Sequence, residues 1–141
     1  MSSPAEIVQS FYAAIAGRDG QALQGLVAES FADDAAVVFP EGLPYGGRVE
    51  GAAKLAKLFA GLVSSPTPIG PQNLTITDII DDGDRIVAHV EFEWYSPTGG
   101  SIDSSALELW SFDGTKVVEM KAFYWDTAAC QALATTDGQT S

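Results

Sequence analysis

Residues 101–127 read SIDSSALELWSFDGTKVVEMKAFYWDT, and in this stretch two strand-like runs flank the dipeptide Asp113-Gly114. Both residues of the dipeptide tolerate a positive φ, as a two-residue hairpin turn requires, so the stretch predicts an antiparallel hairpin. Side chains alternate between the two faces of a strand. One face of the hairpin therefore carries Ile102, Ser104, Ala106, Glu108, Trp110 and Phe112 from the first run and Val118, Met120, Ala122 and Tyr124 from the second.

Glu108 is the one carboxylate at the centre of this otherwise apolar and aromatic face. A buried charge is costly unless it is paired, neutralised or used chemically. An apolar environment favours the neutral form of a carboxyl, so we expect the pKa of Glu108 to lie above its usual value of about 4.3. Such a group can donate a hydrogen bond to a developing oxyanion or act as a general base. The alternative is a structural role, in which Glu108 bonds Tyr12 or a backbone group and only fixes the core.

Length and charge limit the classes of partner. The chain has 141 residues, enough for one domain with a single core. Its 7 Lys and Arg against 19 Asp and Glu give a formal net charge of −12, which disfavours nucleic acid and anionic membrane surfaces as partners. The sequence shows no signal-peptide pattern and no apolar run long enough to span a bilayer. We therefore predict a cytoplasmic protein.

The single cysteine and the single histidine argue against a metal centre. Cys130 and His89 are too few for clustered ligands, so the sequence predicts no metal site. Cys130 has no evident basic neighbour and is expected to be a small packing residue. His89 lies on the strand face opposite Val90 and Phe92, which favours a surface or interface position.

The first half of the chain is predicted to be mainly helical. Residues 3–6, Ser-Pro-Ala-Glu, form a capping box, and the apolar stripe that follows predicts a helix ending at Gly17. Asp19 is expected to cap a second helix, and a third is predicted over residues 51–63. The Gly- and Pro-rich residues 40–50 are expected to form a loop, as a rim or lid.

The second half changes to the two-residue period of strands. We predict four strands that pair antiparallel as a meander, over residues 73–81, 85–95, 102–112 and 116–125. A short strand over residues 35–39 precedes them, and a short helix over residues 127–133 follows. We expect one domain over residues 1–133 and a disordered tail over residues 134–141. Grouped helices and grouped strands predict an α+β fold with a curved antiparallel sheet.

The two faces of this sheet have different expected uses. The concave face, towards the helices, carries Trp94, Trp110, Tyr124, Phe92, Met120 and Glu108. The convex face still shows Leu107, Leu109, Val117, Phe123 and Trp125. Because an exposed apolar patch of that size usually marks an interface, we expect a homodimer that pairs through the convex face.

Several motifs resemble the nuclear transport factor 2-like superfamily, in particular its SnoaL-like and ketosteroid-isomerase-like branch. They are FADDAAVVFP after the second helix, Gly51 at the start of the third, HVEFEWY, LWSFDG and the closing AFYWDTA. The resemblance implies a cone-like, cystatin-like α+β barrel in which a curved sheet wraps around the N-terminal helices. It implies less about function, because this fold hosts isomerases, cyclases, dehydratases, epoxide hydrolases and non-catalytic binding domains.

The resemblance also implies roles for individual residues. Tyr12 falls where ketosteroid isomerases keep the tyrosine of their oxyanion hole, and Glu108 falls where they keep the partner acid, which there is aspartic acid. Trp94, Met120 and Tyr124 fall on positions that line the steroid pocket.

Two departures from the family pattern remove the known catalytic bases. The isomerase base would stand at Phe39, and the aspartate of the cyclase branch would stand close to Ala122. The Asp-Arg-Asp relay of limonene-epoxide-hydrolase-like proteins is not found either. Known reactions of the family are therefore mostly excluded, unless Glu108 takes over the role of the base.

Two hypotheses remain. In the first, a small apolar cyclic molecule enters beneath the 40–50 loop, and Glu108 with Tyr12 performs cofactor-free acid–base chemistry: isomerisation, cyclisation, dehydration or hydrolysis. In the second, the domain is a non-catalytic module that binds a ligand or dimerises, and its pocket has become core. The residues expected to line the pocket are Phe39, Tyr45, Phe59, Phe92, Trp94, Trp110, Met120 and Tyr124.

Overall fold

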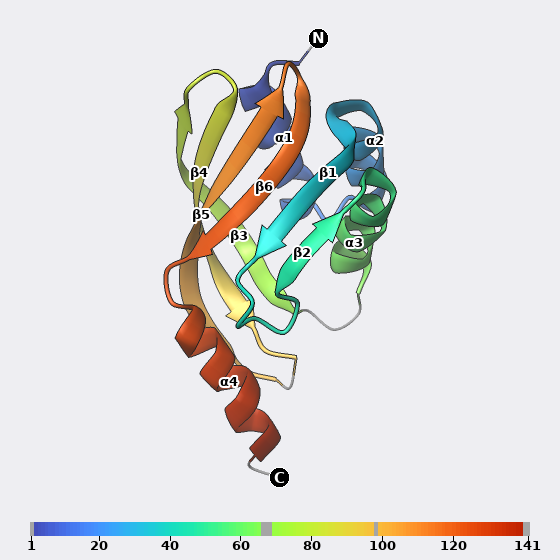
Figure 1. The fold of residues 1–141 in the computed structure, drawn as a ribbon. Helices are drawn as coiled ribbons and strands as arrows, with labels where there is room; N and C mark the ends of the chain where they lie inside the picture. Colours follow the sequence, from blue (N-terminus) through green and yellow to red (C-terminus); the bar gives the residue numbers. More distant parts are fainter. Residues whose placement is uncertain (1, 66–68, 98, 140–141) are drawn as a thin grey trace.

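The computed structural model describes residues 2–65, 69–97 and 99–139, which form four helices and one six-stranded sheet (Figure 1). The helices are α1 (Pro4–Ala16), α2 (Gly20–Ser30), α3 (Ala52–Ser64) and α4 (Thr127–Gln139). The strands are β1 (Phe31–Phe39), β2 (Gly47–Glu50), β3 (Gly70–Asp81), β4 (Arg85–Tyr95), β5 (Ser101–Asp113) and β6 (Lys116–Tyr124).

The sheet is open, curved and mixed, in the order β2-β1-β6-β5-β4-β3. Strands β3 to β6 form the predicted antiparallel meander, whereas β1 runs parallel to β6. The α+β class is confirmed, but the expectation of a wholly antiparallel sheet is wrong at this one pair. The reason is that β1 joins the last strand of the chain instead of a sequence neighbour, and no local pattern signals such a pairing.

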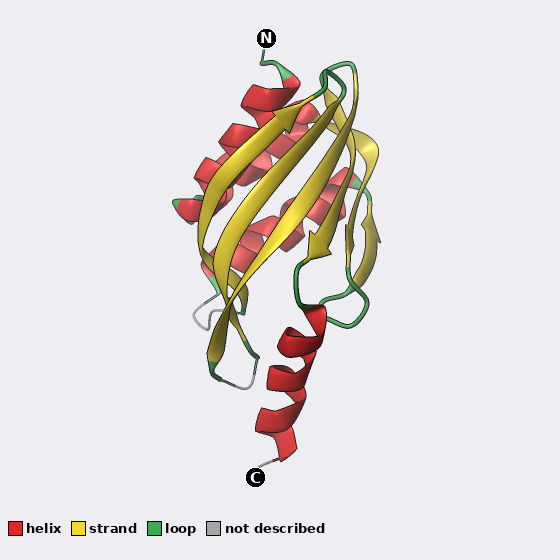
Figure 2. Ribbon diagram, turned by 90° about the vertical axis from the view of Figure 1, so that its left-hand side faces the viewer, coloured by secondary structure: helices red, strands yellow, loops and turns green. Residues whose placement is uncertain are grey.

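The first three helices cover one face of the sheet (Figures 1 and 2). The predicted capping box opens α1: the Ser3 hydroxyl accepts from the Glu6 amide, and the Glu6 carboxylate accepts from the Ser3 amide. Asp19 caps α2 through a hydrogen bond from the Ala22 amide. The apolar stripes of these helices meet the concave face of the sheet in one core. Its largest fully buried side chains include Ile7, Leu23, Leu55, Phe59, Trp94 and Trp110.

Several predicted boundaries differ from the structure; β3, for example, begins at Gly70 and not at residue 73. Strand β1 begins at Phe31, directly after α2, and not at residue 35. Residues 47–50, expected to be part of a loop, form β2 and pair antiparallel with β1. Helix α4 continues to Gln139, so the expected tail is helical over residues 134–139, and its last two residues lie outside the described part. In Figure 2, α4 projects beyond the end of the sheet.

The hairpin predicted from Asp113-Gly114 forms, with an irregularity beside its turn. The register of β5 and β6 shifts between Ser111 and Phe112, so that Phe112 pairs with Val117. Val117 is therefore fully buried, where a strict two-residue period had placed Val118 inward and Val117 on the convex face.

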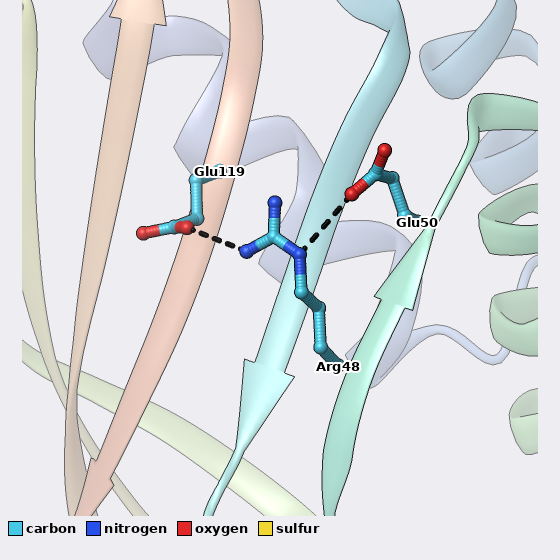
Figure 3. Close-up of polar contacts among 3 residues, drawn as sticks. All are labelled: Arg48, Glu50 and Glu119. Atoms are coloured by element: carbon cyan, nitrogen blue, oxygen red, sulfur yellow. Dashed lines mark hydrogen bonds and ion pairs between the residues drawn. The ribbon is translucent and has the colours of Figure 1, made fainter.

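Arg48 on β2 links this edge strand to β6 across β1 (Figure 3). Its Nε atom lies 3.2 Å from Oε2 of Glu50, on the same strand. Its guanidinium also reaches over β1 to Glu119 on β6, at 3.0 Å. Because all three side chains are solvent-accessible, these ion pairs contribute little to the stability of the fold.

We expect Ser3→Ala to lower the free energy of unfolding by about 1 kcal/mol, because the first turn of α1 loses its side-chain cap. Chemical denaturation followed by circular dichroism measures the change. Ser10→Ala is the matched control, since Ser10 is exposed within α1 and alanine there should be neutral or slightly stabilising. Equal losses in both variants would show that the cap is not the cause.

Candidate functional site

A cavity of about 240 Å³ lies between the concave face of the sheet and helices α1 and α3. Its walls are mostly apolar, and its polar groups are few. The carboxyl of Glu108 and three tyrosine hydroxyls, from Tyr12, Tyr45 and Tyr124, belong to side chains that line it, and three further polar side chains line it as well: Arg18, Gln72 and Asn73. An apolar cavity with a small number of convergent polar groups is typical of a small-molecule site.

Glu108 stands in the centre of β5 and is 7% exposed. The Tyr12 hydroxyl, from α1, donates a hydrogen bond of 2.5 Å to its Oε1 atom. The indole N–H of Trp110 in turn donates to the Tyr12 oxygen at 3.0 Å. The second carboxyl oxygen, Oε2, has no hydrogen-bond partner among the described residues. One oxygen of Glu108 is thus held in place, and the other is available to a ligand.

Burial determines the acidity of this group. Loss of hydration raises the pKa of Glu108 to about 7, although the hydrogen bond from Tyr12 opposes the change. Burial, followed by the negative charge of Glu108, holds the pKa of Tyr12 well above its ordinary value. Glu108 can therefore gain or lose a proton near neutral pH, while Tyr12 stays protonated.

A second polar cluster lines the same cavity. The hydroxyls of Tyr45 and Tyr124 lie 2.6 Å apart, and the indole N–H of Trp94 donates to the Tyr45 oxygen at 2.9 Å. Tyr45 comes from the loop between β1 and β2 and rests against Gly70. A Cβ atom at Gly70 would lie 3.2 Å from Cε2 of the tyrosine ring, so the absence of a side chain leaves room for it. Burial raises the pKa of Tyr45 to about 12.

Comparison with known proteins places the chain in a family. Residues 8–120 match the SnoaL-like domain family. The chain belongs to this family. It thereby falls within the nuclear transport factor 2-like superfamily, as the sequence motifs indicated. No curated protein sequence matches the chain.

Solved structures of the superfamily share the fold. TerC, co-crystallised with polyporic acid, has a TM-score of 0.74 and 26% identity, over 95% of this chain and 99% of its own. An NTF2-like protein of unknown function from Burkholderia pseudomallei K96243 has a TM-score of 0.77 and 25% identity, over 96% and 99%. A SnoaL-like protein from Jannaschia sp. CCS1 has a TM-score of 0.69 and 19% identity, over 93% and 91%.

Of the two positions at which the resemblance implies a family base, Phe39 lines the cavity and Ala122 does not. Phe39 ends β1, lines the cavity and packs edge-on against the Tyr45 ring. Ala122 pairs directly with Glu108 across β5 and β6. Neither can accept a proton, which leaves Glu108 as the one carboxylate among the described residues that line the cavity.

The residues predicted to line the pocket fall into two groups. Five of them do line the cavity: Phe39, Tyr45, Phe59, Met120 and Tyr124. Phe92, Trp94 and Trp110 do not. The two tryptophans are fully buried behind the tyrosines to which they donate, and Phe92 packs against the ring of Tyr124. The aromatic side chains leave the cavity open, and the two indoles support it from behind.

Sequence reasoning missed three polar residues that line the cavity: Arg18, Gln72 and Asn73. The Arg18 guanidinium donates to the Gln72 side chain and to the Ser65 carbonyl, both at 3.2 Å. Arg18 has a φ of 53°, unusual for a residue other than glycine, and it follows the predicted helix end at Gly17. That helix end was the one available signal, and it does not indicate a cavity.

The remaining candidates lie elsewhere. His89 is on the convex side, where its Nδ1 atom lies 2.7 Å from the Thr77 hydroxyl. Cys130 is fully buried, and burial raises the pKa of its thiol to about 11, so it is not poised as a nucleophile. Within the described ranges, no three His, Cys, Asp or Glu side chains gather as a metal site would require. In the same ranges, no helix is long and apolar enough to cross a membrane.

We expect the stability of the protein to depend on pH through Glu108. The folded state keeps this carboxyl protonated up to about pH 7, whereas the unfolded chain ionises it from about 4.5, so stability is lost as the pH rises between these values. The loss should be roughly 3 kcal/mol in the free energy of unfolding, relative to Glu108→Gln, which cannot ionise. Urea denaturation of both proteins across this pH range measures the difference, and parallel pH profiles would contradict the raised pKa.

Proposed function

We propose that this SnoaL-like protein binds a small, largely apolar cyclic compound in the cavity, and that Glu108 moves a proton to or from it without a cofactor. The observation that carries the proposal is the placement of one buried carboxyl, with a pKa of about 7, in the wall of an apolar cavity of about 240 Å³. Groups with strongly shifted pKa values in clefts are the usual candidates for acid–base catalysis.

The geometry of Glu108 suits a general base. A base is most effective when its pKa lies near the working pH, because it is then both ionised and sufficiently basic. Oε1 is engaged by Tyr12, and Oε2 has no partner in the described part of the chain. Oε2 is therefore the atom that would receive a proton from a bound compound.

Tyr12 acts on this chemistry through Glu108. Its hydroxyl hydrogen is directed at the carboxylate, so it is not free to polarise a ligand oxygen while Glu108 is ionised. The resemblance to ketosteroid isomerases implies an oxyanion-hole role for Tyr12. Tyr12 is instead proposed as a positioning residue, which fixes the orientation of the carboxyl and moderates its pKa.

A relative supports binding of a small organic molecule. TerC, which is 26% identical and covers nearly the whole chain, was co-crystallised with polyporic acid. This relative supports only the expectation that the ligand is a small organic molecule. The chemistry is argued from Glu108.

A second candidate function is ligand binding without turnover. The observation that favours it is that neither Phe39, in the wall of the cavity, nor Ala122, which pairs with Glu108, is a carboxylate, although the resemblance implies a family base at or close to each. The two functions share the cavity and differ in whether Glu108 takes part in a reaction, which a proton-transfer assay distinguishes.

We expect the protein to catalyse deuterium exchange from D₂O into C–H bonds next to the carbonyl of small cyclic ketones, such as cyclohexenone and tetralone. Glu108→Gln should lower the rate by about 100-fold or more, because the proton acceptor is lost. The rate should rise with pH through about 7, where Glu108 ionises. Proton NMR measures the exchange.

Two further variants make this test specific. Tyr12→Phe should move the midpoint of the pH profile upward, because the hydrogen bond that lowers the pKa of Glu108 is removed. Glu29→Gln, at an exposed site on α2, is the control and should change nothing. Exchange that Glu108→Gln leaves intact would exclude Glu108 as the base, and no exchange in the wild type would favour binding without turnover.

We also propose that two copies pair through the convex face of the sheet. There Trp125 is 85% exposed, beside the exposed side chains of Ile80, Leu107 and Phe123. The same face holds a groove of about 350 Å³ that these residues line. A two-fold interface needs a projecting group and a recess on one surface, and this face has both.

Size-exclusion chromatography with light scattering should therefore find a dimer at micromolar concentration. Trp125→Glu should shift the protein towards monomer, because it would place a charge in a desolvated contact. Ala28→Glu adds the same charge at an exposed position on α2 and should leave the dimer intact. A monomeric wild type would exclude this interface.

A further inference from the structure

The cavity opens to solvent at the C-terminal end of α1. Of the residues that line it, Tyr12 is buried, and Ile15, about one helical turn further on, is half-buried. Arg18, two residues beyond the end of the helix, is exposed. Leu62, near the end of α3, also lines the cavity and is 37% exposed. The opening of the cavity therefore lies beside Arg18.

Arg18 occupies a backbone position that favours glycine. The Asp19 N–H donates to the Ala14 carbonyl at 2.9 Å. The Arg18 N–H donates to the Ile15 carbonyl at 3.1 Å. These two bonds form a Schellman motif, in which the residue in the place of Arg18 is left-handed and is usually glycine. Arg18 has a φ of 53°, whereas Gly17, one residue earlier, has a φ of −80°. The helix end thus holds an arginine in a conformation that a glycine would adopt more easily.

A second residue with the same backbone conformation lines the cavity. Among the described residues other than glycine, only Arg18 and Asn73 have a positive φ, which is 53° in both. Both line the cavity, and Asn73 directly follows Gln72, to which Arg18 donates. Unfavourable backbone conformations persist where the surrounding structure holds them, and they are common at ligand sites. Their occurrence at one opening indicates that this opening is part of the binding site.

The Arg18 guanidinium is held in place by neutral acceptors. It donates from Nη1 to Oε1 of Gln72 and from Nη2 to the Ser65 carbonyl, both at 3.2 Å. It forms no ion pair with a carboxylate in the described part of the chain. Glu93, which pairs with Gln72 across β3 and β4, instead accepts a hydrogen bond from Asn73 at 2.8 Å. The guanidinium is therefore oriented, but its charge is not neutralised.

This guanidinium can still bind an anion. It has five N–H groups, and the two bonds to Gln72 and Ser65 leave three without an acceptor among the described residues. The planar fork of an arginine matches the two oxygens of a carboxylate. Arg18 is also the one basic side chain among the described residues that line the cavity. In a chain with a net charge of −12, it gives the opening a local preference for negative charge.

We propose that Arg18 binds a carboxylate of the ligand at the opening of the cavity, so that the ligand is an amphipathic acid whose apolar ring lies inside. This inference rests on the proposed binding of a cyclic compound in the cavity and adds the class of that compound. It does not depend on proton transfer by Glu108. The apolar side chains of Ile15, Leu58 and Leu62 line the cavity together with Arg18 and would contact the ring.

The position of Arg18 also limits the cost of binding a charged ligand. A carboxylate held at an exposed opening keeps part of its hydration, whereas a carboxylate inside the apolar cavity would lose it. The charge of the ligand therefore determines which end enters. The ring enters the cavity first, and the acid remains at the opening.

2-Naphthoate and 2-naphthamide are matched probes, because they share a ring and differ in the charge of the attached group. Isothermal titration calorimetry at about pH 6 compares them under conditions in which Glu108 is mostly neutral and an ordinary carboxylic acid is ionised. 2-Naphthoate should bind about tenfold more tightly, as expected for a charge-assisted hydrogen bond. Without a site for an anion the order should reverse, because the net charge of −12 repels 2-naphthoate.

The variants assign the effect to one side chain. Arg18→Asn removes the charge and introduces a residue type that tolerates the left-handed conformation, so the fold should be kept. It should abolish the advantage of 2-naphthoate and leave the affinity for 2-naphthamide unchanged. Arg18→Lys keeps the charge without the planar fork and should retain part of the advantage. Arg85→Gln, at an exposed position on β4 outside the cavity, is the matched control and should retain all of it.

The wild type provides a second measurement that needs no variant. Added sodium chloride should weaken the binding of 2-naphthoate and leave that of 2-naphthamide unchanged, because salt screens the attraction between the guanidinium and the carboxylate. Raising the pH to about 8 should also weaken the binding of 2-naphthoate, since Glu108 is then mostly ionised and repels an anion.

Three results would overturn the inference. They are 2-naphthoate that binds the wild type no more tightly than 2-naphthamide, an advantage that Arg18→Asn leaves intact, and an equal loss in Arg85→Gln. The first result applies even if Arg18→Asn does not fold. If 2-naphthamide binds and the carboxylate adds nothing, this inference fails alone. If neither probe binds, the proposed binding of a cyclic compound fails with it.

Discussion

A carboxyl group at the centre of an apolar sheet face is stable only if its environment has been built for it, and here the hydrogen bond from Tyr12 provides that support. The bond joins α1 to β5, and both side chains line the cavity. It fixes one carboxyl oxygen while burial keeps the pKa near 7. The same contact therefore links the packing of α1 on the sheet to the acidity of the site, which burial raises to a pKa of about 7 and this hydrogen bond moderates.

The aromatic core holds this arrangement rigid. Trp110 packs edge-on against Phe11 and Tyr12, and Trp94 supports the second cluster in the same way that Trp110 supports the first. Each indole is fully buried and passes its one N–H to a tyrosine, which satisfies a polar group that would otherwise be stranded in the core. The tryptophans thus define the cavity without lining it.

The periodicity of the sequence predicted which side chains face the site. It did not predict all of the contacts that these side chains make. The strand period placed Glu108, Met120 and Tyr124 on the concave face, and the helix stripe placed Tyr12 towards them. The pairing of Tyr45 with Tyr124 joins a loop to the last strand, and a loop carries no period from which to predict it. Strand β2 was missed because four residues with alternating exposure and flanking glycines are also typical of a loop. Its pairing with β1 is a tertiary effect.

The parallel pairing of β1 with β6 also bears on the order in which the protein can be made. Val37 pairs with Met120, so β1 has no sheet neighbour on that side until nearly the whole chain exists. Contacts between such distant segments close large loops and are slow to form. Helix α3 packs on β1 and helix α1 packs on β3 and β4, so these contacts can form before the last hairpin is made, whereas the pairing of β1 with β6 cannot. The part of the cavity wall that Phe39 of β1 and Met120 of β6 form is accordingly among the last parts of the molecule to fold.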